Sequence, residues 1–274
     1  MTKRYLTDPD HPEDAAEVEQ MLAEQLPGLA PPPHRAEGMR RRILARTRAA
    51  DAAGETLLRS RLAEGDWRPL VRGVRVKSLS PAHHAVLLEV APGSHLPVHR
   101  HHEDEECVVL RGEVRMRDIR VGAGDYHLAR YASRHAAVHS DDGALLYLRG
   151  TPIGDAGQTL RALVTALMPG RGAAPVTLRA DDGDWKFLAP GVTARLLHRH
   201  GDRESCMLRF APGASLRANA LPVDQESLVV QGEVYYGRSV AVQGDYQLAT
   251  QGHAGPELAS DEGAVLFVRG APLA

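Results

Sequence analysis

Three histidines and one glutamate in the first half of this chain have the spacing of a metal site. His99 and His101 are two residues apart, Glu105 follows four residues later, and His135 lies further along. Residues i and i+2 of a β-strand point to the same face, so the first two histidines should look into one pocket. Imidazole and carboxylate ligands suit zinc, iron, manganese, nickel or copper. Four such ligands could close a tetrahedral zinc site or leave two positions open on iron or manganese.

Glycines frame these four candidate ligands. Gly93 precedes the first histidine, Gly112 follows the glutamate, and Gly124 precedes the last histidine. We expect Gly112 to permit the turn that begins the next hairpin, because glycine accepts backbone angles that other residues avoid.

Several neighbouring residues receive no such role from their positions. His102 should face away from the pocket, because it is adjacent to His101 on the strand, and Glu106 should point away from Glu105 for the same reason. His83 and His84 lie in an expected loop, whereas His139 could face the pocket or solvent. No nucleophile or acid–base pair emerges elsewhere, so catalytic residues stay unknown.

An internal repeat predicts the architecture. The segment that starts at Ala91 recurs at Ala211 with an offset of 120 residues, and the motif GDYHLA recurs as GDYQLA. Upstream the offset becomes 118, where Trp67 matches Trp185. Repeated segments of this length indicate two copies of one domain.

The second copy has lost the candidate ligands. Asn219, Leu221, Gln225 and Gly255 stand at the equivalent positions. Leucine cannot bind a metal and glutamine has no negative charge, while the repeat's glycines remain. We therefore predict a metal site in the first copy alone and a structural second copy.

Both copies have an all-β pattern. Short apolar runs such as CVVLRGEV and SLVVQGEV are separated by glycine, proline and aspartate. Strands at this spacing favour a sandwich or a closed barrel. The residues before the repeat have helical spacing, first over Glu13 to Leu26 and then over roughly His34 to Ala63. Between the repeats, the run LRALVTALMPG is the expected linking strand.

The predicted organisation therefore has four parts. Residues 1–64 form a helical N-terminal region, 65–151 a metal-binding domain, 152–183 a linker, and 184–274 a degenerate domain without metal ligands. The fold class is mainly β, with a short α-helical N-terminal region.

Composition excludes several classes of function. The formal net charge is -2, which favours neither nucleic acid nor a membrane surface as a partner, although five arginines between Arg40 and Arg48 form a local basic face. Cys107 and Cys206 form no CxxC pair, so no disulfide framework is implied. Each is expected to be a small buried residue on a strand. The polar N-terminus has no apolar signal segment, so the expected location is cytoplasmic.

The ligands and glycines match the two motifs of the cupin superfamily. The first motif, G-x5-H-x-H-x3,4-E-x6-G, matches at every fixed position from Gly93 to Gly112. In the second motif the first glycine and His135 match, but Arg130, Ala132 and His139 replace a proline, a glycine and an asparagine. The resemblance implies two tandem cupin barrels, each a jelly roll or double-stranded β-helix.

Among cupins the chain resembles the ChrR type, named for the cupin of a zinc-containing anti-sigma factor. The Trp67 entry, the APG before the metal motif, the GDY turn and the closing SDDGALLYLRG carry this likeness. It implies a divalent metal, with zinc favoured and iron, manganese or nickel as alternatives, held by His99, His101, Glu105 and His135. It also implies a regulatory role, with a sigma factor as protein partner of the N-terminal helices.

Two other functions stay open. The same ligands serve metal-dependent dioxygenases of the cupin superfamily that act on small diketones or hydroxyketones, where the substrate would bind at the metal. A metal-stabilised binding module without turnover is the third reading. The chain could act as a monomer or a homodimer.

Overall fold

The computed structural model describes residues 57–150, 172–217, 221–237, 239–252 and 256–273. Both helices predicted for the N-terminal region begin outside this range. The linking run LRALVTALMPG also lies outside the described residues.

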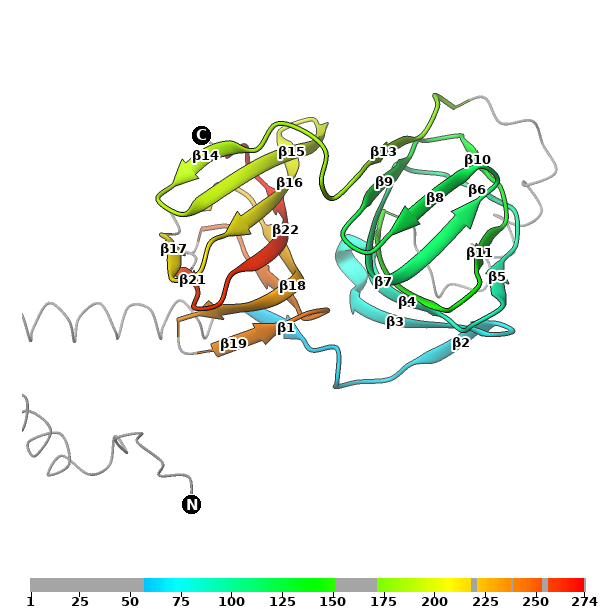
Figure 1. Cartoon of the computed structure of the whole chain (residues 1–274), viewed down its shortest axis with the longest axis horizontal. Coiled ribbons are helices and arrows are strands. Elements are labelled where there is room, and N and C mark those ends of the chain that lie inside the picture. Colours follow the sequence, from blue (N-terminus) through cyan, green and yellow to red (C-terminus); the bar gives the residue numbers. More distant parts are fainter. Residues whose placement is uncertain (1–56, 151–171, 218–220, 238, 253–255, 274) are drawn as a thin grey trace, which may run out of the picture. The chain divides into compact units, whose positions relative to one another are not determined.

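The first repeat folds into an antiparallel barrel (Figure 1). Its main ladder has the strand order β13-β9-β7-β12-β4-β3-β2, and three shorter strands, β5, β8 and β11, complete it. The strands of this repeat are β2 (Arg68–Val71), β3 (Val74–Ser80), β4 (Ala85–Val90), β5 (Ser94–Leu96), β6 (His99–Arg100), β7 (Glu105–Met116), β8 (Ile119–Gly122), β9 (Tyr126–Ala129), β10 (Arg134–His135), β11 (Val138–Ser140) and β12 (Ala144–Arg149). The short 3-10 helix η1 (Pro81–His83) joins β3 to β4.

The second repeat builds the same barrel. Its ladder order, β1-β20-β18-β22-β16-β15-β14, matches the first barrel strand for strand. Its strands are β14 (Lys186–Ala189), β15 (Val192–His200), β16 (Arg203–Phe210), β17 (Ala214–Leu216), β18 (Gln225–Tyr236), β19 (Ser239–Val242), β20 (Tyr246–Ala249), β21 (Leu258–Ser260) and β22 (Ala264–Gly270). The prediction of two tandem jelly-roll barrels is confirmed.

The barrels exchange their outermost strands. β1 (Leu58–Ser60) precedes the first barrel in sequence but pairs with β20 of the second, while β13 (Val176–Leu178) precedes the second barrel but pairs with β9 of the first. The predicted helix that runs to Ala63 is therefore wrong at its end, where the chain is extended. The chain is extended there because β1 pairs with β20. Leu57, just before β1, packs into the core of the second barrel.

The aspartate of each GDY motif anchors the exchanged strand. Asp245 accepts a hydrogen bond from the Leu62 backbone N–H at 2.8 Å, and Asp125 accepts one from the Ala180 N–H at 2.8 Å. The second carboxylate oxygen of each aspartate closes its own turn, as Asp125 does with the Gly122 N–H. The motif thus fixes both a turn and the incoming strand.

Strand β7 is buried on both faces. Its residues alternate, so that Cys107 and Val109 enter the core of the first barrel while Val108 and Leu110 pack against the second. The Tyr147 ring packs at a tilted angle against Phe267 across the same boundary, with ring centroids 5.4 Å apart. This explains why the run CVVL is continuously apolar rather than alternating.

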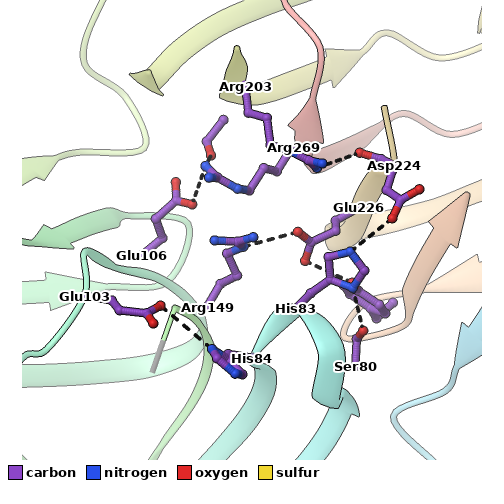
Figure 2. Close-up of polar contacts among 12 residues, drawn as sticks. Ser80, His83, His84, Glu103, Glu106, Arg149, Arg203, Asp224, Glu226 and Arg269 are labelled. Atoms are coloured by element: carbon purple, nitrogen blue, oxygen red, sulfur yellow. Dashed lines mark hydrogen bonds and ion pairs between the residues drawn. The ribbon is translucent and has the colours of Figure 1, made fainter. Parts of the chain in front are cut away.

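A pair of equivalent ion pairs joins the two barrels (Figure 2). Arg269 of β22 donates to Glu106 of β7 at 3.0 Å, and Arg149 of β12 donates to Glu226 of β18 at 3.2 Å. Tyr126 and Tyr246 donate to the same two carboxylates. Because every partner is repeated, the two barrels meet through matching surfaces.

Gly112 differs from its prediction. It lies inside β7 rather than at a turn, with φ at +75°. A Cβ there would lie 2.0 Å from the Gly143 carbonyl oxygen, so only glycine permits the close approach of β12 at this bulged register. The motif therefore has glycine at this position because β7 and the start of β12 approach each other closely.

Substitution of Arg269 tests the buried ion pairs. Glu106 and Arg269 are only 2% and 4% exposed. Arg269→Met leaves the buried Glu106 carboxylate without its cation and is expected to lower the free energy of unfolding by about 3–5 kcal/mol. Urea denaturation measures this loss.

Two further variants check that result. The double variant Glu106→Gln/Arg269→Met should recover most of the stability, because no unpaired charge is then left buried at this position. The exposed pair Arg75–Glu89 is the control, and Arg75→Met should change the free energy of unfolding by about 1 kcal/mol or less. Equal losses for Arg269→Met and Arg75→Met would contradict the interpretation.

Candidate metal centre

Strand β6 and the start of β7 position the predicted ligands of the first barrel. His99 begins β6, His101 directly follows it, and Glu105 is the first residue of β7. The segment between the two strands turns the chain back, which returns the carboxylate to the histidines. The i, i+2, i+6 spacing therefore converges in space as the sequence predicts.

Three predicted ligands lie together. One ligand atom from each of His99, His101 and Glu105 lies within 4.8 Å of the others. The two imidazole rings are 4.9 Å apart in an edge arrangement, and His101 Nδ1 lies 3.8 Å from a Glu105 oxygen. His101 is 2% and Glu105 6% exposed, whereas His99 is half-buried. Two ligands are thus enclosed, and the third borders more accessible space.

A backbone contact orients His99. Its Nδ1 lies 2.9 Å from the Pro97 carbonyl oxygen, which can only accept, so the Nδ1 proton is donated there. The lone pair then resides on Nε2, which is the arrangement by which metal-binding histidines are commonly held.

The fourth predicted ligand is placed by the backbone. β10 pairs antiparallel with β6, and His135 stands directly opposite His99 in this ladder. Directly opposed residues are close neighbours in an antiparallel pair. The side chain of His135 lies outside the described part of the structure.

A turn just before β10 keeps a glycine-like conformation without glycine. Ala132, which replaces the second motif's glycine, has φ at +60°. Its N–H donates to the His101 carbonyl oxygen, while the His101 N–H donates to Ser133. These two bonds fasten the ligand strand to the turn, and they account for a strained alanine at this position.

The site favours neutral imidazole. Burial, followed by the positive charge of His99 and His127 when protonated, lowers the pKa of His101 to about 3. Burial, and then the Glu105 carboxylate, raises the pKa of the Cys107 thiol. His101 is therefore ready to bind a cation at neutral pH, whereas Cys107 stays a protonated core residue, as predicted.

His127 is a buried residue that sequence reasoning missed. It lies opposite Cys107 on β9, and its Nδ1 is 2.8 Å from the Thr177 hydroxyl on the exchanged strand β13. Burial lowers its pKa, and Glu105 opposes that effect. The difference between GDYHLA and GDYQLA was the available signal, because Gln247 occupies this place in the second copy.

The group of metal ligands does not include the neighbouring residues His102, His139, Glu106 and His83. His102 is exposed, and His139 is also exposed, stacked on His95 with ring centroids 4.9 Å apart. Glu106 does point away from Glu105, but it belongs to the ion pairs between the barrels. His83 also has a partner there, because its Nε2 lies 3.4 Å from Asp224.

The described residues of the second barrel form no group of metal ligands equivalent to His99, His101 and Glu105. Leu221 packs against the hydrophobic core of that barrel, where the first barrel has His101. Gln225 begins β18 as Glu105 begins β7. Asn219 and Gly255 lie outside the described residues. An apolar side chain therefore fills the space that the ligands use in the first barrel.

Two imidazoles and one carboxylate with mutually close ligand atoms fit a divalent transition metal. His99, His101 and Glu105 would hold the ion, with His135 as the fourth predicted ligand. A bound ion would supply Lewis acidity or an anchor for an oxygen-bearing ligand.

A comparison with protein families shows to which family the chain belongs. The sequence model described as "ChrR Cupin-like domain" matches residues 55–153 and 173–274. The chain belongs to this ChrR cupin-like family. Each match begins before the boundary predicted for its domain, because it includes the exchanged strand. No curated protein matches the chain.

Solved cupin structures share the fold of this ChrR-like bicupin. A provisionally assigned dioxygenase from Nostoc punctiforme is 12% identical, with a TM-score of 0.57 over 78% of this chain and 82% of that one. Oxalate decarboxylase from Bacillus subtilis is 14% identical, with a TM-score of 0.55 over 79% of this chain and 76% of that one. Another structure of that decarboxylase is described by its Mn(II) centres and has a TM-score of 0.53.

Within the described ranges, no helix has the length and apolarity needed to cross a membrane.

Loss of one ligand tests the first site. His101→Ala is expected to lower the affinity for Zn²⁺ by more than about 100-fold, because even residues that only orient metal ligands contribute roughly 10–100-fold. Competition with a chromophoric chelator measures the affinity. His95→Ala, which removes an exposed histidine, is the control and should bind as the parent does. Unchanged binding by His101→Ala would contradict the assignment.

The buried His101 also predicts a pH dependence for metal-free protein. An unfolded histidine titrates near about 6.5, whereas burial lowers the pKa of folded His101 to about 3. Between these values the unfolded chain binds the extra proton, so the free energy of unfolding should fall as the pH is lowered through this window. Urea denaturation at pH 7 and pH 5 measures the fall. His101→Gln should lose less stability than the parent, and an equal loss would refute the prediction.

Proposed function

We propose that this ChrR-like bicupin is a metal-binding regulatory protein that acts on an extracytoplasmic-function sigma factor. The first barrel holds a divalent ion, with zinc favoured, and the N-terminal region contacts the sigma factor. The second barrel is structural.

The contrast between the two barrels carries this proposal. Both copies keep the strand order, the exchanged strand and the buried ion pair, although only the first keeps the ligands. Leu221 packs against the core at the place of a ligand, which supports a barrel fold that does not need a metal. The ion of the first barrel must serve another purpose, and sensing or regulation matches the family to which the chain belongs.

Co-expression tests the regulatory role. The full chain should co-purify with an extracytoplasmic-function sigma factor encoded beside it and should lower transcription from that factor's promoter. Arg40→Glu/Arg41→Glu should weaken the complex if the basic N-terminal segment contacts an acidic surface. The absence of both a complex and an effect on transcription would exclude the proposal.

Metal-dependent oxygenation is the second candidate. His99 borders accessible space beside two enclosed ligands, so a small substrate could reach the ion. Protein loaded with Fe(II) should then consume O₂ in the presence of a small diketone, and His99→Ala should not. An electrode records O₂ uptake. No uptake by iron-loaded protein with diketones or hydroxyketones would exclude this candidate.

A further inference from the structure

A cleft between the barrels contains a second group of metal-binding residues. Asp104 comes from the segment that joins β6 to β7, whereas His198 and His200 come from β15 of the second barrel. One ligand atom from each of the three lies within 4.8 Å of the others.

The volume of this cleft is about 320 Å³. Asp104, His198 and His200 line it, and this volume accommodates an ion with bound water.

The strand geometry aims both histidines at the cleft. His198 and His200 are two residues apart on β15, and their ring centroids lie 6.2 Å apart. A bulge between Leu196 and His198 shifts the register with β16, and bulges of this kind re-aim side chains. The histidines thereby reach the loop of the other barrel.

His198 is buried and incompletely satisfied. The residue is 9% exposed, and its Nε2 is buried without a hydrogen-bond partner among the described residues. The nearest acidic atom is Asp104 Oδ2 at 3.6 Å, which is beyond a good hydrogen bond. Burial lowers the pKa of His198, so a neutral ring faces the carboxylate. A buried polar atom left in this way usually has a missing partner.

The carboxylate of Asp104 is already held in place. Its Oδ1 accepts the Tyr131 N–H at 2.6 Å, which leaves Oδ2 directed toward the cleft. Arg130 lies 3.4 Å from that oxygen and is the competing cation, and its side chain is one-third exposed. Glu106 and Arg269, which also line the cleft, neutralise each other.

The equivalent place on the other side of the interface lacks this arrangement. There Asp224 faces His83, whose Nε2 is 3.4 Å away and whose Nδ1 contacts the Ser80 hydroxyl at 2.9 Å (Figure 2). Both nitrogens of His83 are thus engaged, and no second histidine joins the pair among the described metal-binding groups. Among the described residues, three metal-binding side chains therefore come together on the Asp104 side of the interface but not on the Asp224 side.

We propose that Asp104, His198 and His200 form a second site for a zinc-type divalent ion, bridging the two barrels. Two imidazoles and one carboxylate are a ligand set that zinc accepts, with a further position left for water. Since Asp104 directly precedes Glu105, the bridging ion would also fasten the loop that carries a ligand of the first site. The proposal does not depend on the regulatory role.

Calorimetric titration of the metal-free full chain with Zn²⁺ tests this site. The parent should bind two equivalents, and His200→Ala, which removes an exposed side chain, should bind one. His101→Ala should also bind one, retained at the second site. His83→Ala is the matched control from the opposite side of the interface and should keep both equivalents. Circular dichroism checks that each variant is folded.

Two results would overturn the proposal. One is a parent that binds a single equivalent, with none left in His101→Ala. The other is that both His200→Ala and His198→Ala/His200→Ala still bind two equivalents of Zn²⁺. Either result identifies the cluster as a contact between a histidine and an aspartate with no ion.

Discussion

Two carboxylates, Glu106 and Glu226, lie buried between the barrels, and each is matched by an arginine of the other barrel. A charge removed from water is tolerated only when it is paired and hydrogen bonded, so the barrels must meet in the register that brings these partners together. Tyr126 and Tyr246 complete the pairs. Since Glu106 follows Glu105 on β7, the same constraint fixes one strand face toward the interface and the other toward the metal ligands.

The exchanged strands extend this dependence to the rest of the chain. β13 supplies Thr177 to His127, close behind the metal ligands, although it precedes the other barrel in sequence. β1 brings Leu57 into the second core in return. Each barrel is therefore completed by a segment that the sequence assigns to its neighbour.

The two halves of the molecule show how one fold separates stability from chemistry. Leu221 gives the second barrel apolar packing at the place where His101 offers the first a metal ligand. Likewise, one side of the interface satisfies its histidine with Ser80 and Asp224, while the other assembles His198, His200 and Asp104 around a cleft. In both cases the repeat keeps the backbone and changes the side chains.

The sequence by itself determined the two barrels and the convergence of His99, His101 and Glu105. Those features depend on local spacing, since strand periodicity decides which residues share a face. Tertiary structure alone decided the strand exchange, the role of Glu106 and the meeting of Asp104 with His198. These contacts join residues far apart in the chain, and no local period records which distant strand will be the partner. The helix predicted to reach Ala63 failed for the same reason, because pairing with β20 outweighs the helical pattern there.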